Sequence, residues 1–206
     1  MEQTLTTRLT RFLPSRTTLD LRAELGIKSY LRPDEKEFFG EDGDQALVQG
    51  LGGLKLAQSL GRDTGLQLEY TRQHSFTGQS RFIRDLLYDT DDELFNDRYS
   101  YQGQTLGLTL KHLGRWATRT QLRGQLGSRD YIQRLALDLD GVPLGLDQTR
   151  RDRWQSLEAE LVRPFQPSRG PALELTLHWL YRRTSSNDPY YDAGANTYST
   201  GLQCSF

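Results

Sequence analysis

The chain has 206 residues, which suits a single domain, and its 26 lysines and arginines nearly balance 27 aspartates and glutamates. A net charge of −1 offers no general excess of positive charge for a nucleic-acid partner. Charged residues make up 26% of the sequence, and no apolar stretch approaches the roughly 18 residues that a membrane-spanning helix needs. The single cysteine, Cys204, excludes an internal disulfide and a multi-thiolate zinc site.

Alternation of apolar and polar residues predicts β-strands along the whole chain. From Leu19 to Ile27 every second residue is apolar, and the residues between them are mostly polar or charged. A helix would scatter the apolar set around its circumference, so the segment is predicted to be a strand with two different faces. With a weaker first strand around Leu5, Leu9 and Leu13, nine strands are predicted. The other alternating segments are 48–56, 66–70, 106–110, 122–126, 157–161, 173–181 and 198–206.

The length of the strands and the order of the connections predict a membrane barrel. The strands are expected to have roughly 10–15 residues, against about five or six in globular proteins, and a tilted strand crosses a bilayer in about nine to eleven. Short turns are expected at 14–16, 61–63, near Gly114 and at 164–170. They alternate with long polar connections at 32–44, 77–97, 130–148 and 184–193. Short turns on one rim and long loops on the other are typical of outer-membrane barrels.

We therefore predict an all-β fold, an antiparallel up-and-down transmembrane β-barrel. Its leucines would face lipid and its charged residues would face a watery lumen, because a bilayer admits β-structure only as a closed barrel. The alternative is a soluble secreted β-sandwich, a binding module whose leucines pack in a dry interior.

The C-terminal strand carries a familiar pattern. Alternate residues Tyr198, Thr200, Leu202, Cys204 and Phe206 resemble the terminal signal of bacterial outer-membrane proteins. The resemblance implies that this strand is recognised by the barrel assembly machinery.

A wider stretch resembles the end of the barrel in outer-membrane translocation proteins, among them the surface lipoprotein assembly modifiers. It includes Arg150, Arg151, Asp152, Pro164, a Leu-x-Leu-x-Leu strand ending at Tyr181, Ser186, Asn187, Asp188, Tyr190, Tyr191, Asp192, Asn196 and Phe206. The resemblance implies a Gram-negative cell outer membrane, and a conduit for export of surface lipoproteins, other proteins or polymers. It also implies contact with outer-membrane lipid and lipopolysaccharide, a periplasmic tetratricopeptide repeat domain upstream, and no cofactor. A general diffusion porin is the alternative within the class.

The parity of the strands leads to an expectation about the domain. If Phe206 lies at the periplasmic rim, nine alternating strands place the start of the chain on the opposite side. Bacterial barrels normally have an even number of strands. Residues 1–206 are therefore expected to be the C-terminal part of a larger barrel domain, incomplete at its N-terminus.

Charged residues of the polar strand faces are the candidate functional residues. Arginines gather on the sixth predicted strand and carboxylates on the seventh. Such rows either set a transverse field that selects polar solutes or pair across strands and fill the interior. The predicted lumen-lining residues are Arg22, Glu24, Lys28, Lys55, Glu69, Arg119, Arg123, Arg129, Glu158, Glu160, Glu174 and Arg182.

Other motifs give weaker candidates. The acidic segment 89–97 has oxygen ligands at alternate positions but lacks the glycine and glutamate of an EF-hand loop; just upstream, 82–87 has helical spacing. His74 with Ser75 and Asp85 is the one catalytic set that can be assembled, and nothing in the spacing brings these groups together. We predict neither enzymatic activity nor a metal site. Aromatic belts are expected near both rims, from Trp116 and Phe206 at the short turns and Tyr99, Tyr101, Trp179, Tyr181, Tyr190 and Tyr191 toward the long loops.

Overall fold

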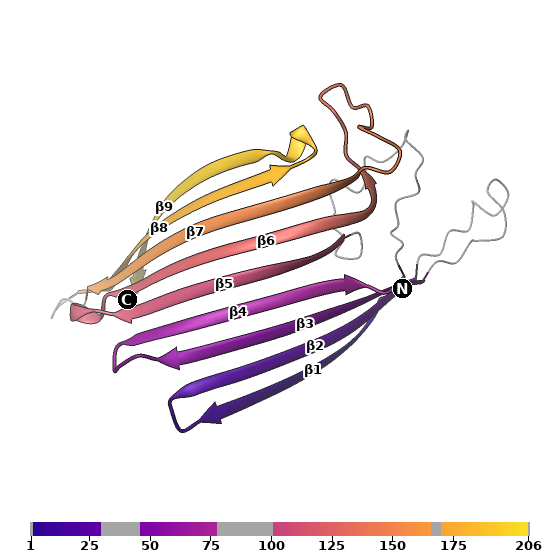
Figure 1. Ribbon diagram of the computed structural model, residues 1–206. Helices are drawn as coiled ribbons and strands as arrows, with labels where there is room; N and C mark the ends of the chain where they lie inside the picture. Colours follow the sequence, from indigo (N-terminus) through magenta and orange to yellow (C-terminus); the bar gives the residue numbers. More distant parts are fainter. Residues whose placement is uncertain (1, 30–45, 78–100, 166–169, 206) are drawn as a thin grey trace.

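The fold is a single antiparallel sheet of nine strands in chain order (Figure 1). This computed structural model describes residues 2–29, 46–77, 101–165 and 170–205. The predicted all-β, up-and-down order is confirmed. The strands are β1 (Glu2–Leu13), β2 (Thr17–Ser29), β3 (Ala46–Ser59), β4 (Thr64–Ser75), β5 (Tyr101–Leu113), β6 (Arg119–Leu135), β7 (Thr149–Phe165), β8 (Ala172–Ser186) and β9 (Ala193–Ser205).

The connections alternate in length, with two corrections to the predicted boundaries. Short turns join β1 to β2 and β3 to β4, and the short 3-10 helix η2 (Arg115–Ala117) lies between β5 and β6. Strand β6 continues to Leu135 and β8 to Ser186, so the connections are 136–148 and 187–192 instead of 130–148 and 184–193. The end of β8 is polar on both faces, and the pairing of β6 with β7 is irregular between Asp130 and Leu135, so neither end has the regular alternation of a strand. The connection 187–192 contains the second 3-10 helix, η3 (Pro189–Tyr191).

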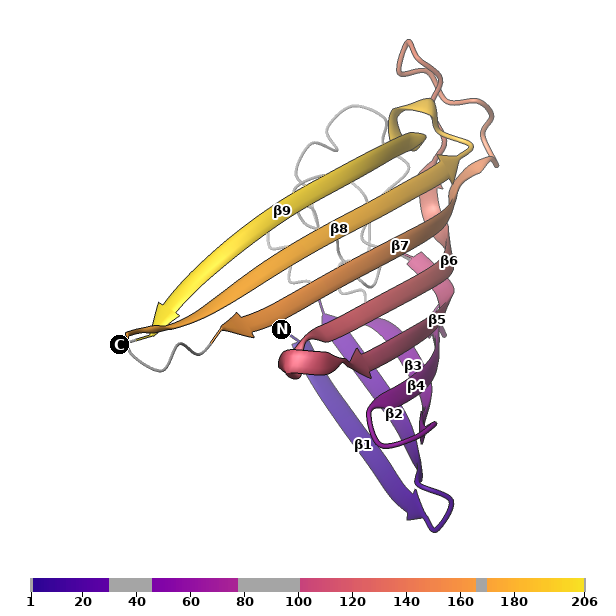
Figure 2. The ribbon, with the colours of Figure 1, turned by 90° about the vertical axis from the view of Figure 1, so that its left-hand side faces the viewer.

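The sheet is curved and open (Figure 2). Strands β1 and β9 form its two edges, and among the described residues neither has a partner on its outer side. Because eight antiparallel pairings separate them, these two edges run in the same direction. The arrangement is compatible with an outer-membrane β-barrel, although the described strands do not close into one.

One face of the sheet carries matched leucines, and we call it the leucine face. The register pairs Leu56 with Leu68 and Leu68 with Leu108, so leucines of successive strands lie side by side. In β5, Leu108 is 50% exposed, and Leu126 of β6 is 56% exposed. Within the described chain nothing packs over this face.

The opposite side, the polar face, contains most of the buried residues. Thr109 is 6% exposed although its neighbours in sequence, Leu108 and Leu110, are well exposed on the other face. A small side chain is buried in this way when its face is concave and longer side chains surround it. Glu24 and Gln49, also on the polar face, are buried as well. The described residues form no ordinary hydrophobic core, since their buried apolar members are Leu47, Tyr131, Ala136 and Val162.

Candidate functional site: the polar face of the sheet

Ion pairs on the polar face reach over intervening strands. Arg119 of β6 contacts Glu174 of β8 at 2.7 Å across β7. Arg123, also of β6, lies 3.9 Å from Glu69 of β4 across β5. Next-nearest strands lie about 10 Å apart, twice the usual strand spacing, so these side chains lean toward one another. Together with the burial, these contacts identify the polar face as the concave one.

The register places all twelve predicted lumen-lining residues on this concave face. Arg123 lies directly opposite Glu158, and Gln121 opposite Glu160. The arginines of β6 and the carboxylates of β7 are therefore adjacent rows. The twelve are Arg22, Glu24 and Lys28 on β2, Lys55 on β3, Glu69 on β4, Arg119, Arg123 and Arg129 on β6, Glu158 and Glu160 on β7, and Glu174 and Arg182 on β8.

A charged cluster occupies the polar face of β1 to β4. Arg8 donates from Nε to Asp20 at 2.8 Å, and Arg22 donates to Glu24 at 2.6 Å. Lys55 lies opposite both Asp20 and Glu69 in the register. All of these residues except Glu24 line a hollow of about 420 Å³. Sequence reasoning missed Arg8 and Asp20, although Asp20 alternates with Arg22 on the same strand face.

The turn-side end of β5 to β8 carries a second cluster. His178 Nε2 lies 3.0 Å from Glu158 Oε1, one strand away. Arg119, Glu160 and Glu174 line a hollow of about 660 Å³ together with Lys111 of β5. Both signs of charge are present, so the surface offers donors and acceptors to a polar solute or chain.

A third cluster lies at the loop-side end of the polar face. Arg150 and Asp152 of β7 are 5% and 4% exposed and form a bidentate pair, with distances of 2.9 and 2.6 Å. The Arg150 guanidinium carbon lies 3.1 Å from the ring centroid of Tyr191 and 4.5 Å from that of Tyr131. Such a fork matches both a carboxylate and aromatic faces. The pair follows from Arg-x-Asp spacing, which puts both side chains on one strand face.

Asp188 anchors the adjoining connections. Its side chain is 1% exposed and accepts hydrogen bonds from the backbone N–H groups of Tyr190 and Leu137, at 3.1 and 3.3 Å. The Tyr190 hydroxyl donates to the Leu139 carbonyl oxygen at 2.7 Å. Connection 136–148 is thereby attached to the turn between β8 and β9. The resemblance motifs contained Arg150, Asp152 and Asp188, and the alternation of connections placed 130–148 and 184–193 at one rim, but nothing in the sequence indicated the contacts that join them.

The predicted assembly signal lies on the free edge. Tyr198, Thr200, Leu202 and Cys204 occupy the leucine face of β9, where they pair with Trp179, Leu177, Leu175 and Leu173. Tyr198 is 75% exposed and Leu202 68%. Phe206 lies outside the described residues, and recognition of this strand by an assembly machinery stays a prediction.

Several other predictions fall outside the described residues. They concern the connection 32–44, the helical spacing at 82–87, the acidic segment 89–97, Asp85 and Tyr99. His74 lies on the leucine face beside Phe76, with ring centroids 5.3 Å apart, and Ser75 lies on the opposite face. Within the described ranges no three histidines, cysteines or acidic residues are grouped to hold a metal ion.

The aromatic residues follow the predicted belts in part. Trp116 lies in η2 at the short-turn rim and is 73% exposed, and Tyr190 and Tyr191 lie in η3 at the other rim. Trp179 lies near the middle of β8 instead of at its loop end. Tyr101 begins β5 on the polar face, where Arg129 lies 4.8 Å from its ring centroid.

Comparison of the chain with protein-family models, with curated proteins and with solved structures gives no match. In the part of the chain that the structure describes, no helix has the length and apolar character needed to cross a membrane. The resemblance to outer-membrane translocation proteins therefore stays a prediction, and the functional argument rests on the two faces of the sheet.

Proposed function

We propose that these strands form the wall of a transmembrane β-barrel in a Gram-negative outer membrane, with the leucine face against lipid and the polar face along a water-filled conduit. The observation that carries the proposal is an apolar band on the leucine face with polar residues at both of its ends. On β5, Leu106, Leu108 and Leu110 lie between Gln104 and His112 on the same face.

The borders of the band coincide on β5 and β6, and on β7 both are displaced by two residues toward the short turns. Gln104 pairs with Ser128 at the loop-side border, and His112 pairs with Thr120 at the turn-side border. On the leucine face of β7, Gln155 and Arg163 lie on either side of Leu157, Ala159 and Leu161. An apolar band between polar borders is expected of a membrane barrel, because its lipid-facing band is about 25 Å tall with polar rims. A soluble monomer rarely exposes more than a few hundred Å² of contiguous apolar surface.

The concave face supports a conduit. It carries charge of both signs in adjacent rows, with Arg123 opposite Glu158 and Arg119 paired to Glu174. Such a wall suits the passage of a polar chain or solute, which fits the export of surface lipoproteins, other proteins or polymers that the sequence resemblance implies. Open conductance without a translocated partner would favour the general diffusion porin instead.

Two neighbouring residues of β6 provide a direct test. In a Cys204→Ser background, Leu122→Cys and Arg123→Cys place one thiol on each face of the same strand. In lipid vesicles we expect a fluorophore at position 122 to be quenched by brominated acyl chains. A thiol at position 123 should instead react with a water-soluble, membrane-impermeant reagent.

The matching solution experiment is purification with and without detergent. The proposal expects aggregation without detergent and a monodisperse protein with it. A protein that stays monodisperse in plain buffer, with the thiol at position 122 protected from water-soluble reagents, would instead be a β-sandwich with a dry interior. Conductance across a planar bilayer then separates an open pore from a plugged wall.

A further inference from the structure

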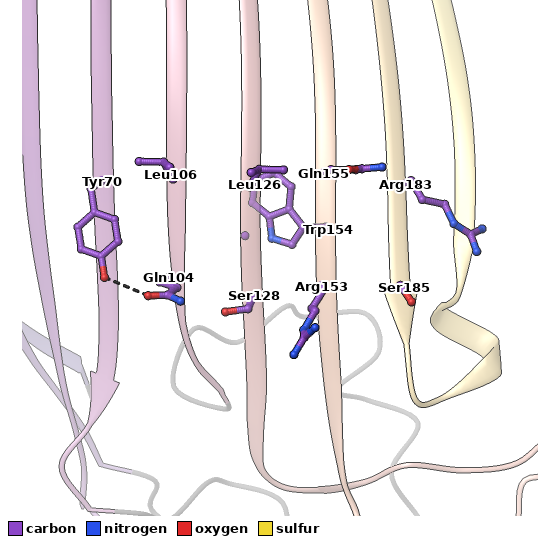
Figure 3. Close-up of a pocket in the computed structure, with 11 residues that line it drawn as sticks. Tyr70, Gln104, Leu106, Leu126, Ser128, Arg153, Trp154, Gln155, Arg183 and Ser185 are labelled. Atoms are coloured by element: carbon purple, nitrogen blue, oxygen red, sulfur yellow. Dashed lines mark hydrogen bonds between the residues drawn. The ribbon is translucent and has the colours of Figure 1, made fainter.

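The leucine face has a hollow of about 590 Å³ at the loop-side border of the apolar band (Figure 3). The register arranges its lining residues in two rows across the strands. Tyr70, Leu106, Leu126, Gln155 and Arg183 form the row nearer the middle of the sheet. Gln104, Ser128, Arg153 and Ser185 form the row nearer the loops. On β5 and β6 the hollow therefore adjoins the leucine band, whereas on β7 and β8 both rows are polar, with Gln155 and Arg183 in the inner row and Arg153 and Ser185 in the outer one.

From these leucines beside two arginines we infer that the hollow binds the phosphate group of a lipid in the leaflet on the long-loop side, through Arg153 and Arg183. The inference rests on the proposed membrane location. Arg153 lies opposite Ser185, and Gln155 lies opposite Arg183. The two arginines are therefore diagonal neighbours on adjacent strands, about 7–8 Å apart at the backbone. The two guanidinium groups point apart (Figure 3), so their binding of one phosphate requires these exposed side chains to rotate toward each other, after which both forks can donate to its oxygens.

The guanidinium group of Arg153 is available to an anion. Both arginines are exposed on the leucine face. Arg183 forms an ion pair with Asp192, and within the described residues no carboxylate pairs with Arg153. Ser185 and Gln155 add a hydroxyl and an amide to the same patch. Tyr70 donates to Gln104 at 3.0 Å, so the hydroxyl at the far side of the hollow is already bonded within the protein.

The apolar side of the hollow indicates a lipid instead of a free anion. Leu106 and Leu126 continue directly into the leucine band, so acyl chains below a bound phosphate would lie on apolar surface. The turn-side border does not offer the same patch. There Arg163 lies over the rings of Trp116 and Phe165, with its guanidinium carbon 5.1 and 4.8 Å from their centroids.

The test compares lipid probes on the detergent-solubilised chain. Binding of diphosphorylated lipid A, of the same lipid after removal of its phosphates, and of inorganic phosphate is measured by native mass spectrometry and by titration. We expect the phosphorylated lipid to bind at least roughly 10-fold more tightly than the dephosphorylated lipid, from the loss of charge-assisted hydrogen bonds. Millimolar inorganic phosphate should not displace it.

The variants Arg153→Gln and Arg183→Gln should each weaken this binding, and the double variant should bind both lipids equally. Arg11→Gln is the matched control, since Arg11 lies exposed on the leucine face of β1 near the opposite rim. Equal binding of the two lipids by the unaltered chain, or an equal loss in Arg11→Gln, would overturn the inference. Displacement by inorganic phosphate would assign the site to a free anion and would also overturn it.

The lipid-binding test can refute the phosphate site without refuting the proposed function. A chain that needs detergent and passes the thiol test at positions 122 and 123, but does not distinguish the two lipids, refutes only the phosphate site. A chain that is monodisperse in plain buffer refutes the membrane location first.

Discussion

Arg150 and Asp152 are both buried and share two hydrogen bonds, although they lie at the end of a sheet whose leucines are exposed. The Ser186 hydroxyl donates to the same carboxylate at 2.7 Å. The Tyr191 ring stacks on the Arg150 guanidinium, whose carbon lies 3.1 Å from the ring centroid. The pair therefore joins β7, β8 and η3 at the long-loop rim. Removing one partner of such a buried ion pair destabilises the fold strongly, because the remaining charge stays out of water.

Substitution Asp152→Asn leaves the Arg150 guanidinium buried without a counter-charge. We expect a loss of roughly 3–5 kcal/mol in the free energy of unfolding, measured by urea titration of the refolded protein. The control is Glu174→Gln, which removes the partner of Arg119 from an ion pair whose two side chains are 59% and 36% exposed and should cost far less, since exposed ion pairs contribute little. Equal losses in the two variants would show that the buried pair has no special role.

The Asp188 side chain connects two loops, and its removal should loosen both. In Asp188→Ala the backbone N–H groups of Leu137 and Tyr190 lose their acceptor. We expect faster hydrogen exchange at these two amides and faster proteolysis within 136–148, with a cost of about 1–3 kcal/mol for the loss of two partly buried hydrogen bonds. Asp140→Ala, in the same connection but exposed, is the control and should leave both amides protected.

Gly127 leaves room for the Trp154 ring. A Cβ atom at Gly127 would lie 2.4 Å from the indole, whereas one at Gly124, on the same strand, meets nothing within 4 Å. We expect Gly127→Ala to displace the indole at a cost of about 1–3 kcal/mol and to shift its fluorescence emission. The measurement uses chains with Trp116→Phe and Trp179→Phe, so that Trp154 alone emits. An unchanged spectrum in Gly127→Ala, or an equal shift in Gly124→Ala, would contradict the prediction.

Substitution of a leucine by arginine tests whether lipid surrounds the leucine face. Leu108 is 50% exposed in the middle of the apolar band. In a bilayer, Leu108→Arg should cost about 2–4 kcal/mol, measured by refolding into lipid vesicles at a series of urea concentrations. Gln125→Arg on the polar face of β6 is the control and should change stability little. If position 108 accepts arginine as readily as position 125, lipid does not surround the leucines.

The sequence by itself determined the strands and the two faces. Strand alternation is a local property of the backbone, because successive side chains point to opposite sides. The alternation in residues 19–27 therefore predicted a strand with Leu21 and Arg22 on opposite faces. The same reasoning placed the twelve charged residues on one face. It failed at the loop-side ends of β6 and β8, because the register of β6 shifts between Asp130 and Leu135 and the last three residues of β8 are polar on both faces.

Only the tertiary structure decided which polar residues meet. Arg119 contacts Glu174 across an intervening strand because the sheet curves and the polar side chains converge on its concave side. Arg150 lies under Tyr191, 41 positions away (191 − 150), because the β8–β9 turn folds back over the end of β7. Curvature and loop return depend on contacts between distant segments, so no local period encodes them.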